Sequence, residues 1–213
     1  MDSSMRIFIP LALALLLSSC TPRLFRDMES VGKVGIAKED LCPVFAKTDT
    51  VITFNMQIDY KENNFAGLLV VSGGERERST RLVLTSYFGM TVFDFEIDAD
   101  SFVVNRCFEQ MNRKVVLSLL EKDFRTLLFY NVPESIKARK CEKGSMVGYK
   151  MEASDGKAYY LIDGLSRQLQ KIHRPGAVRS LQIDFVQYEQ GFPSVIEMKH
   201  PTIGLKMRLE LVK

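Results

Sequence analysis

The chain has 213 residues, of which 46% are hydrophobic, 26% charged and 10% aromatic, and its formal net charge is +3. This composition excludes a disordered tail, a collagen-like fibre and a disulfide-rich miniprotein. The charge is spread along the chain, which argues against nucleic acid as a partner, because nucleic-acid binding needs basic residues clustered on one face.

The first twenty residues have the features of an export signal. Arg6 is their only basic residue, and the apolar run at residues 7–17 is shorter than the ~20 residues that span a bilayer. A basic start, a short apolar core and small residues after it are typical of a secretory signal peptide, which we predict over residues 1–19. A short buried helix is the alternative.

The end of this segment, Leu17-Ser18-Ser19-Cys20, resembles the lipobox of bacterial lipoproteins. The resemblance implies cleavage before Cys20, diacylglycerol on its thiol and a further acyl chain, such as palmitate, on its amino group. Several acyl chains together anchor a protein stably. The alternative is an ordinary cleavage site with an incidental cysteine. Thr21-Pro22 follow, without the aspartate that retains some lipoproteins in the inner membrane, so we expect an outer-membrane anchor, on the periplasmic face, with residues 20–27 as a lipidated tether.

Beyond the tether, short runs with period-two alternation predict strands. Phe54 and Met56 alternate with Asn55 and Gln57, which is typical of a strand with one buried face. A turn cluster at residues 61–64 separates this strand from the next. In the first half of the chain we predict strands at residues 49–60, 65–72, 81–86, 90–97 and 102–106.

The periodicity then changes to that of a helix. Apolar residues recur every three or four positions between Val115 and Phe129, which predicts an amphipathic helix that Pro133 ends. The segment 134–145 is polar, and we expect a loop there, with the basic run at residues 137–140 in solvent; weak contact of this run with anionic head groups is the alternative. Strands return at residues 147–153, 157–162, 168–173, 181–188, 195–200 and 205–212.

The sum of these elements is a mainly β chain with helices, of the α+β class. Its ten to eleven strands have short connections, which require antiparallel pairing, and a sheet of that size must curl. One helix cannot cover the whole concave face, so we expect it to act as a lid over an apolar cavity. The alternative is a sheet that packs solid. The expected lining for a hydrophobic ligand is Phe54, Met56, Leu68, Leu82, Leu84, Phe93 and Phe95.

The order of elements is similar to the LolA/LolB superfamily of lipoprotein carriers. Residues 84–93 (LTSYFGMTVF), 100–106 (DSFVVNR) and 192–198 (FPSVIEM) resemble three of its strand elements, and the helix falls where the family has one. The resemblance covers residues 50–212 and is closest to LolB-like outer-membrane lipoproteins of the Bacteroidetes type, including the DUF4292 family.

This resemblance implies a curved antiparallel half-barrel over residues 28–213 whose helical lid covers a hydrophobic cavity. LolB accepts acylated proteins and has an exposed apolar residue in a hairpin loop that helps to insert them. The loop that we match to it, residues 72–80, is charged, which disfavours insertion of cargo at that position.

We therefore expect a membrane-anchored lipoprotein that binds acyl chains or lipoprotein cargo in envelope traffic. The alternative is a scaffold lipoprotein that binds a protein partner and has a filled core. We predict no enzyme, since neither Asp94 with Glu96 nor Ser166 has a partner base nearby in the sequence. His173 and His200 are far apart, so we predict no metal and no cofactor.

Three cysteines remain after Cys20, namely Cys42, Cys107 and Cys141. The expected compartment is oxidising and allows one disulfide, but the spacing leaves its pairing open.

Overall fold

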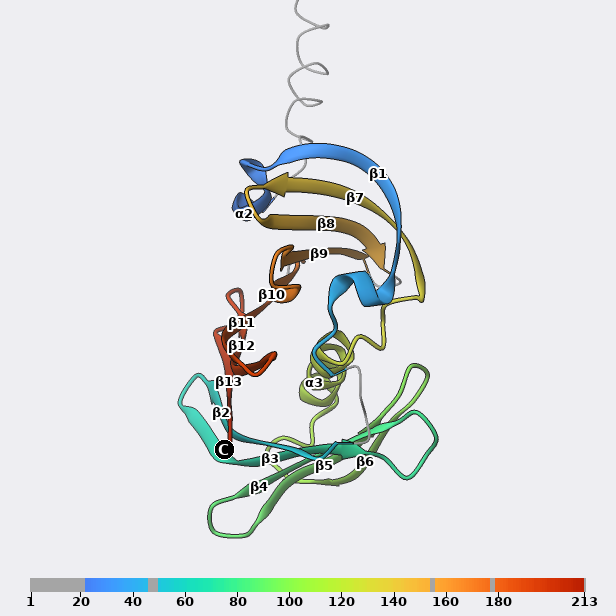
Figure 1. Cartoon of the computed structure of the whole chain (residues 1–213). Coiled ribbons are helices and arrows are strands. Elements are labelled where there is room, and N and C mark those ends of the chain that lie inside the picture. The colour runs from blue at the N-terminus through green and yellow to red at the C-terminus, as the bar shows by residue number, and fades with distance from the viewer. Residues whose placement is uncertain (1–21, 46–49, 154–155, 177–178, 213) are drawn as a thin grey trace, which may run out of the picture.

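The computed structural model describes residues 22–45, 50–153, 156–176 and 179–212 (Figure 1). The predicted signal peptide and Cys20 lie outside the described residues and stay predictions. The described chain forms thirteen strands, one long helix and two short helical turns. In chain order the elements are α2 (Arg23–Arg26), β1 (Glu29–Ala37), the 3-10 turn η1 (Lys38–Leu41), β2 (Ile52–Tyr60), β3 (Asn63–Gly73), β4 (Thr80–Ser86), β5 (Thr91–Ile97), β6 (Phe102–Cys107), α3 (Lys114–Leu127), β7 (Ser135–Lys143), β8 (Met146–Ala153), β9 (Gly156–Asp163), β10 (Gln168–Arg174), β11 (Leu181–Glu189), β12 (Phe192–His200) and β13 (Leu205–Leu211).

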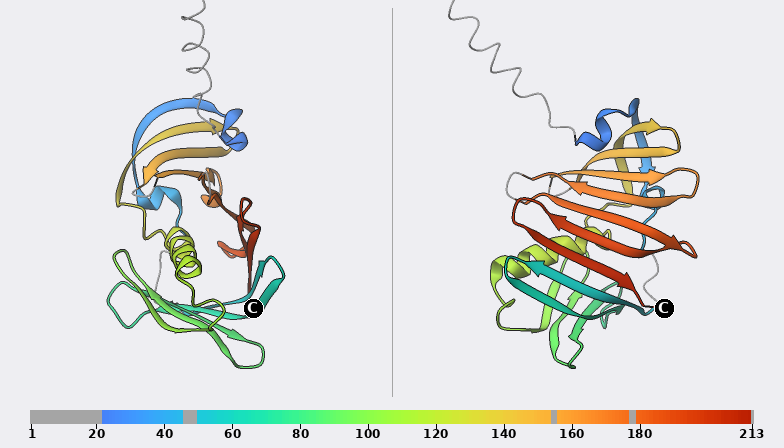
Figure 2. Two further views of the ribbon diagram at one scale, coloured as in Figure 1. Left: turned by 180° about the vertical axis from the view of Figure 1, so that it is seen from behind. Right: turned by 90° about the vertical axis from the view of Figure 1, so that its left-hand side faces the viewer.

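The strands form one antiparallel sheet built from two runs of sequential hairpins. One run holds β2 to β6 and the other β7 to β13, and the two runs meet where β13 pairs with β2. The sheet has two edges: β1, which pairs with β7, and β6. It curves around α3, with β1, β7 and β8 at the top of Figure 1 and β2 to β6 at the bottom, and Figure 2 shows the curve from two further sides. The predicted open antiparallel sheet is confirmed, but it has thirteen strands rather than ten or eleven.

Alternation along the strands decides which side chains face the helix. In β13, Met207 and Leu209 are buried, whereas Lys206 and Arg208 are exposed. Met207 lies opposite Ile58 of β2 in the register, so apolar residues of both strands line up on the concave face. A slip of one residue would turn this row outward, which is why burial of one face fixes the register.

The predicted helix is present as α3 and covers part of the concave face. Its buried stripe includes Leu120, Phe124 and Leu127, spaced three or four residues apart. Phe124 packs against Phe93 of β5, with 5.9 Å between ring centroids. This packing holds the C-terminal half of α3 against the sheet.

Two strands escaped prediction, and they pair with each other. The segment 134–145, expected as a loop, contains β7, in which buried Ile136 and Ala138 alternate with basic residues. Only these two apolar residues mark the strand, so its many charges read as a solvated loop. Its partner β1 contains Gly32 and Gly35, and glycine is depleted in strands, which weakens the pattern there as well.

The described chain begins on the outer, convex face of this sheet. Phe25 of α2 packs on Tyr159 and Leu161 of β9 in a small cluster separate from the main core. The ring centroids of Phe25 and Tyr159 are 5.2 Å apart. Gly148 makes room for this contact, because a Cβ there would lie 2.5 Å from the Phe25 ring.

Candidate functional site

An apolar cavity of about 550 Å³ lies between the first half of α3 and one end of the sheet. Its wall comes from α3, the loop before it, the β2–β3 hairpin, the β12–β13 turn and the β10–β11 connection. The volume falls within the roughly 300–1,000 Å³ that is usual for small-molecule sites. The lining residues are Ile58, Tyr60, Asn63, Phe65, Gln110, Met111, Arg113, Val115, Val116, Leu119, Leu120, Arg179, Ile203 and Leu205.

The first turns of α3 leave part of their apolar surface uncovered. Val115 is 66% exposed and Val116 is half-buried, and both line the cavity. Further along the helix, Leu119 and Leu120 form its inner wall and are buried. The helix therefore closes the sheet at its C-terminal half and leaves an accessible apolar surface at its N-terminal half.

The cavity is apolar inside and carries basic groups at its rim. Ten of its fourteen lining residues are apolar, and the charged ones are Arg113 and Arg179, both exposed. A guanidinium group pairs well with a carboxylate or a phosphate. The arrangement is suited to a molecule with an apolar tail and an anionic head.

A buried polar pair fastens α3 to the sheet next to this cavity. A 2.7 Å hydrogen bond joins His200 Nε2, at the end of β12, to Asp123 Oδ2 on α3, and each side chain is 2% exposed. Burial raises the pKa of Asp123, although the hydrogen bond to His200 opposes this shift. His200 Nδ1 is buried without a hydrogen-bond partner in the described chain. Sequence reasoning missed this pair, because residues so far apart show no spacing signal.

A second, larger hollow of about 720 Å³ lies at the opposite end of α3. Seven of its fifteen lining residues are charged, among them Lys38, Glu77 and Asp98. An acyl chain would not displace water favourably from such a wall, since the gain comes from burying apolar surface. The cavity at the start of α3 is therefore the better candidate for an apolar ligand.

None of the seven residues expected to line a ligand cavity lies on the wall of the apolar cavity at the start of α3. Six of them are fully or almost fully buried in the core beneath α3, where they contact one another. The rings of Phe93 and Phe95, for example, stack with centroids 4.4 Å apart. The six are Phe54, Met56, Leu82, Leu84, Phe93 and Phe95.

The seventh residue, Leu68, points to the other face of the sheet and is 39% exposed. Its neighbour Leu69 takes the inner position, opposite Phe54 of β2 and Leu84 of β4. The run at residues 65–71 is apolar almost throughout, so it lacks the alternation that would assign a face.

The sequence did contain the signal for the actual lining. The alternating row that begins at Phe54 continues to Ile58 and Tyr60, and these two reach the cavity. Position along the strand decides between core and cavity, and the distance from each residue to α3 cannot be read from a periodic pattern.

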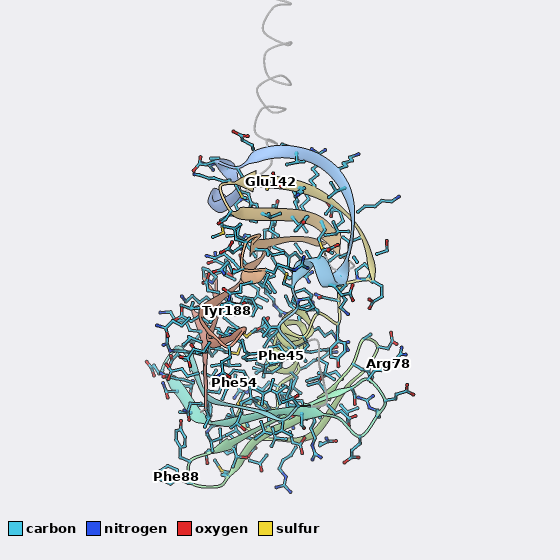
Figure 3. All side chains as sticks on the ribbon, in the orientation of Figure 1. Phe45, Phe54, Arg78, Phe88, Glu142 and Tyr188 are labelled. Atoms are coloured by element: carbon cyan, nitrogen blue, oxygen red, sulfur yellow. The ribbon has the colours of Figure 1, made fainter. Side chains whose placement is uncertain are left out.

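The β4–β5 hairpin has an apolar tip, which the resemblance to the LolA/LolB carriers did not predict. Phe88 is 99% exposed at this tip, and Tyr87 and Met90 beside it are also exposed. The loop that we matched to the insertion hairpin of LolB, residues 72–80, connects β3 to β4, and its Arg76 donates hydrogen bonds to Glu96. Figure 3 shows Phe88 projecting from the bottom of the molecule, away from Glu142 at the top.

The described residues contain no group of three or more His, Cys, Asp or Glu side chains placed to hold a metal ion. Cys42, Cys107 and Cys141 are free thiols in this structure. In the ranges that the structure covers, no helix has the length and apolar content needed to span a membrane.

Comparisons with known proteins place the fold more firmly than the function. No family model matches the chain, and no curated protein does. Among solved structures, a candidate outer membrane lipoprotein-sorting protein domain from Vibrio parahaemolyticus matches with a TM-score of 0.52 and 11% sequence identity, over 83% of this chain and 88% of that one.

A DUF1329 family protein from Desulfovibrio piger also matches, with a TM-score of 0.45, 9% identity and coverage of 81% and 87% of the two chains. The assignment of the fold rests on the Vibrio domain. Because the two sequences are only 11% identical, the likeness concerns the fold alone. The chain therefore shares the fold of the Vibrio lipoprotein-sorting protein domain.

Proposed function

We propose that this chain is a lipid-anchored outer-membrane lipoprotein that binds acyl chains in its cavity and acts in lipoprotein or lipid traffic of the envelope. The acyl chain is free or belongs to a lipoprotein cargo. The observation that carries the proposal is the apolar cavity of about 550 Å³ beside the exposed start of α3. The lipobox-like residues 17–20 and the fold of the Vibrio lipoprotein-sorting domain support the envelope location.

The two arginines at the rim of the cavity favour ligands with an anionic head. Arg113 and Arg179 would pair with a carboxylate or phosphate head, while the tail replaces water against Leu119, Leu120 and Phe65. We propose binding without a catalytic step, in line with the expectation from the sequence. Kinship with the LolB-like DUF4292 group is part of the same proposal, supported by the order of strands and helix.

The test is titration with a fluorescent fatty acid, using the chain from residue 20 onward with Cys20→Ser. Val115→Glu puts a negative charge on the cavity wall at an exposed position, where it would repel the carboxylate head, and should lower affinity by about tenfold or more. Arg113→Gln should weaken binding of the fatty acid but not of the matching fatty alcohol, which has no negative head.

The matched control is Val51→Glu, since Val51 has the same exposed fraction, 66%, and does not line the cavity. Its affinity should equal that of the parent protein. A flat titration of the folded parent would refute ligand binding, and an equal loss in both valine variants would show that the cavity is not the site.

A second candidate function, a scaffold for a protein partner, is favoured by the hairpin tip. A fully exposed Phe88 flanked by Tyr87 and Met90 is the kind of apolar projection that partner proteins cover. A photo-crosslinking residue at position 88 would capture a stable envelope partner if this function holds, and the fatty acid titration would then be flat.

A further inference from the structure

The outer face of the β1–β7–β8 edge carries a row of basic side chains. In the register, Lys33 of β1 lies opposite Arg139 of β7, and Arg139 lies opposite Lys150 of β8. Lys137 is two residues before Arg139 and shares its face. The segment that appeared to be a basic loop is therefore part of an ordered basic surface.

These residues point away from the core because their neighbours point into it. Ala138 and Met151 belong to the buried core, and Val34 packs against it. The four basic residues, Gly35 and Glu152 surround a shallow hollow of about 490 Å³, which we call the basic hollow. Parts of Val34, Ala138 and Met151 complete its lining. Within the described chain, Lys33, Lys137, Arg139 and Lys150 form no ion pair, and Glu152 is the one acidic residue of this hollow.

The start of the described chain lies beside the basic hollow. Phe25 packs on Tyr159, whose ring lies 5.5 Å from the Lys150 ammonium and which pairs with Lys150 in the register. Figure 1 shows α2 next to β7 and β8, at the end of the molecule opposite the β4–β5 hairpin. The convex face that carries α2 also carries the basic residues.

The covalent chain limits how far the predicted anchor can be from this surface. Cys20 precedes Pro22 by two residues, and two extended residues span at most roughly 7 Å. A lipid on Cys20 would hold the start of α2 within that reach of the membrane surface. Because α2 and the basic hollow share the convex face, the molecule can turn this face to the membrane, where charges within about one Debye length of the headgroups, ~8 Å at physiological salt, are little screened.

We propose that the basic hollow docks on anionic lipid headgroups of the membrane that holds the anchor. The basic side chains of the hollow are complementary to anionic headgroups, and the hollow is open to solvent. The described residues begin two positions after the predicted anchor at Cys20. This docking rests on the anchor in the proposed function and not on the ligand cavity. It orients the molecule so that Phe88 and the β4–β5 hairpin point away from the anchoring membrane, towards a partner or a second membrane.

The experiment is cosedimentation of the chain from residue 20 onward, with Cys20→Ser, with vesicles of neutral lipid alone or mixed with anionic lipid. All thirteen strands lie within residues 29–211, so the sheet is complete without the export signal. We expect binding to anionic vesicles only. Each basic residue near an anionic surface strengthens binding roughly fivefold, so Lys33→Gln/Arg139→Gln/Lys150→Gln should weaken it on the order of a hundredfold.

The matched control removes three exposed charges elsewhere, as Lys61→Gln/Lys122→Gln/Lys206→Gln. Both triple variants have the same net charge, so a specific surface predicts a large loss in the first and little in the second. Equal losses, or binding that does not depend on anionic lipid, would overturn the proposal. The fatty acid titration reports the cavity separately, since it needs no membrane.

Discussion

Replacement of Phe93 by alanine tests whether the predicted lining residues are core. Phe93 is fully buried, stacks on Phe95 and contacts Phe124 of α3 at 5.9 Å between centroids. Removing such a ring costs about 3–5 kcal/mol, because it leaves a cavity and forfeits aromatic contacts worth roughly 0.5–1.5 kcal/mol each. At about 2–4 °C per kcal/mol for a domain of this size, the melting temperature should fall by roughly 6–20 °C.

The assay pairs urea unfolding, followed by circular dichroism, with fatty acid titration of the same variant under native conditions. Phe93→Ala should lose stability and keep its affinity, whereas Val115→Glu should keep its stability and lose affinity. The reasoning would be refuted if Phe93→Ala lost less than about 1.5 kcal/mol of stability while its affinity fell. That result would place Phe93 at a ligand and not in the core.

Two further predictions concern buried polar groups. Asp123→Ala leaves the buried His200 ring without its hydrogen-bond partner and should lower the free energy of unfolding in urea by about 3–5 kcal/mol. Asp123→Asn keeps one hydrogen bond and should cost less. Equal, small losses in both variants would show that the pair does not hold α3 to the sheet. Hydrogen bonds from the Ser79 hydroxyl and the Arg76 backbone N–H lower the pKa of Glu96, so the folded state favours its ionised form. Its contribution is present above the unfolded pKa, near ~4.3, and is lost as the pH falls through the lower folded value, so Glu96→Gln should show a shallower loss of stability in acid; unchanged acid titration curves would exclude this role.

The strands that could be predicted are those whose two faces meet different surroundings. β13 alternates because Met207 and Leu209 pack on the core while Lys206 and Arg208 meet solvent. β7 fails as a prediction because only its first half faces the core: after Ala138 the next positions on the same face are Lys140 and Glu142, which form an ion pair. At the rim of the sheet the buried face narrows, and the periodic signal fades with it.

The candidate site was harder to predict than the fold, and for a different reason. Apolar residues of core and cavity share one alternating row, so Met56 and Ile58 look alike in the sequence. Only the folded structure separates them: both are buried, but Ile58 lies on the wall of the cavity and Met56 does not. A cavity is a space between residues, so no sequence pattern marks its position.

The pairing of the last strand with the second one has a consequence for how the protein forms. Most of the chain separates β2 from its partner β13 in the sequence, and β2 to β6 and α3 separate β1 from its partner β7. A topology with such distant partners has a high contact order and folds slowly, because long loops must close before their contacts contribute. The run of strands β2 to β6 lacks its neighbour β13 until the last strand has formed, so we expect the complete sheet to form only after the whole chain has been synthesised.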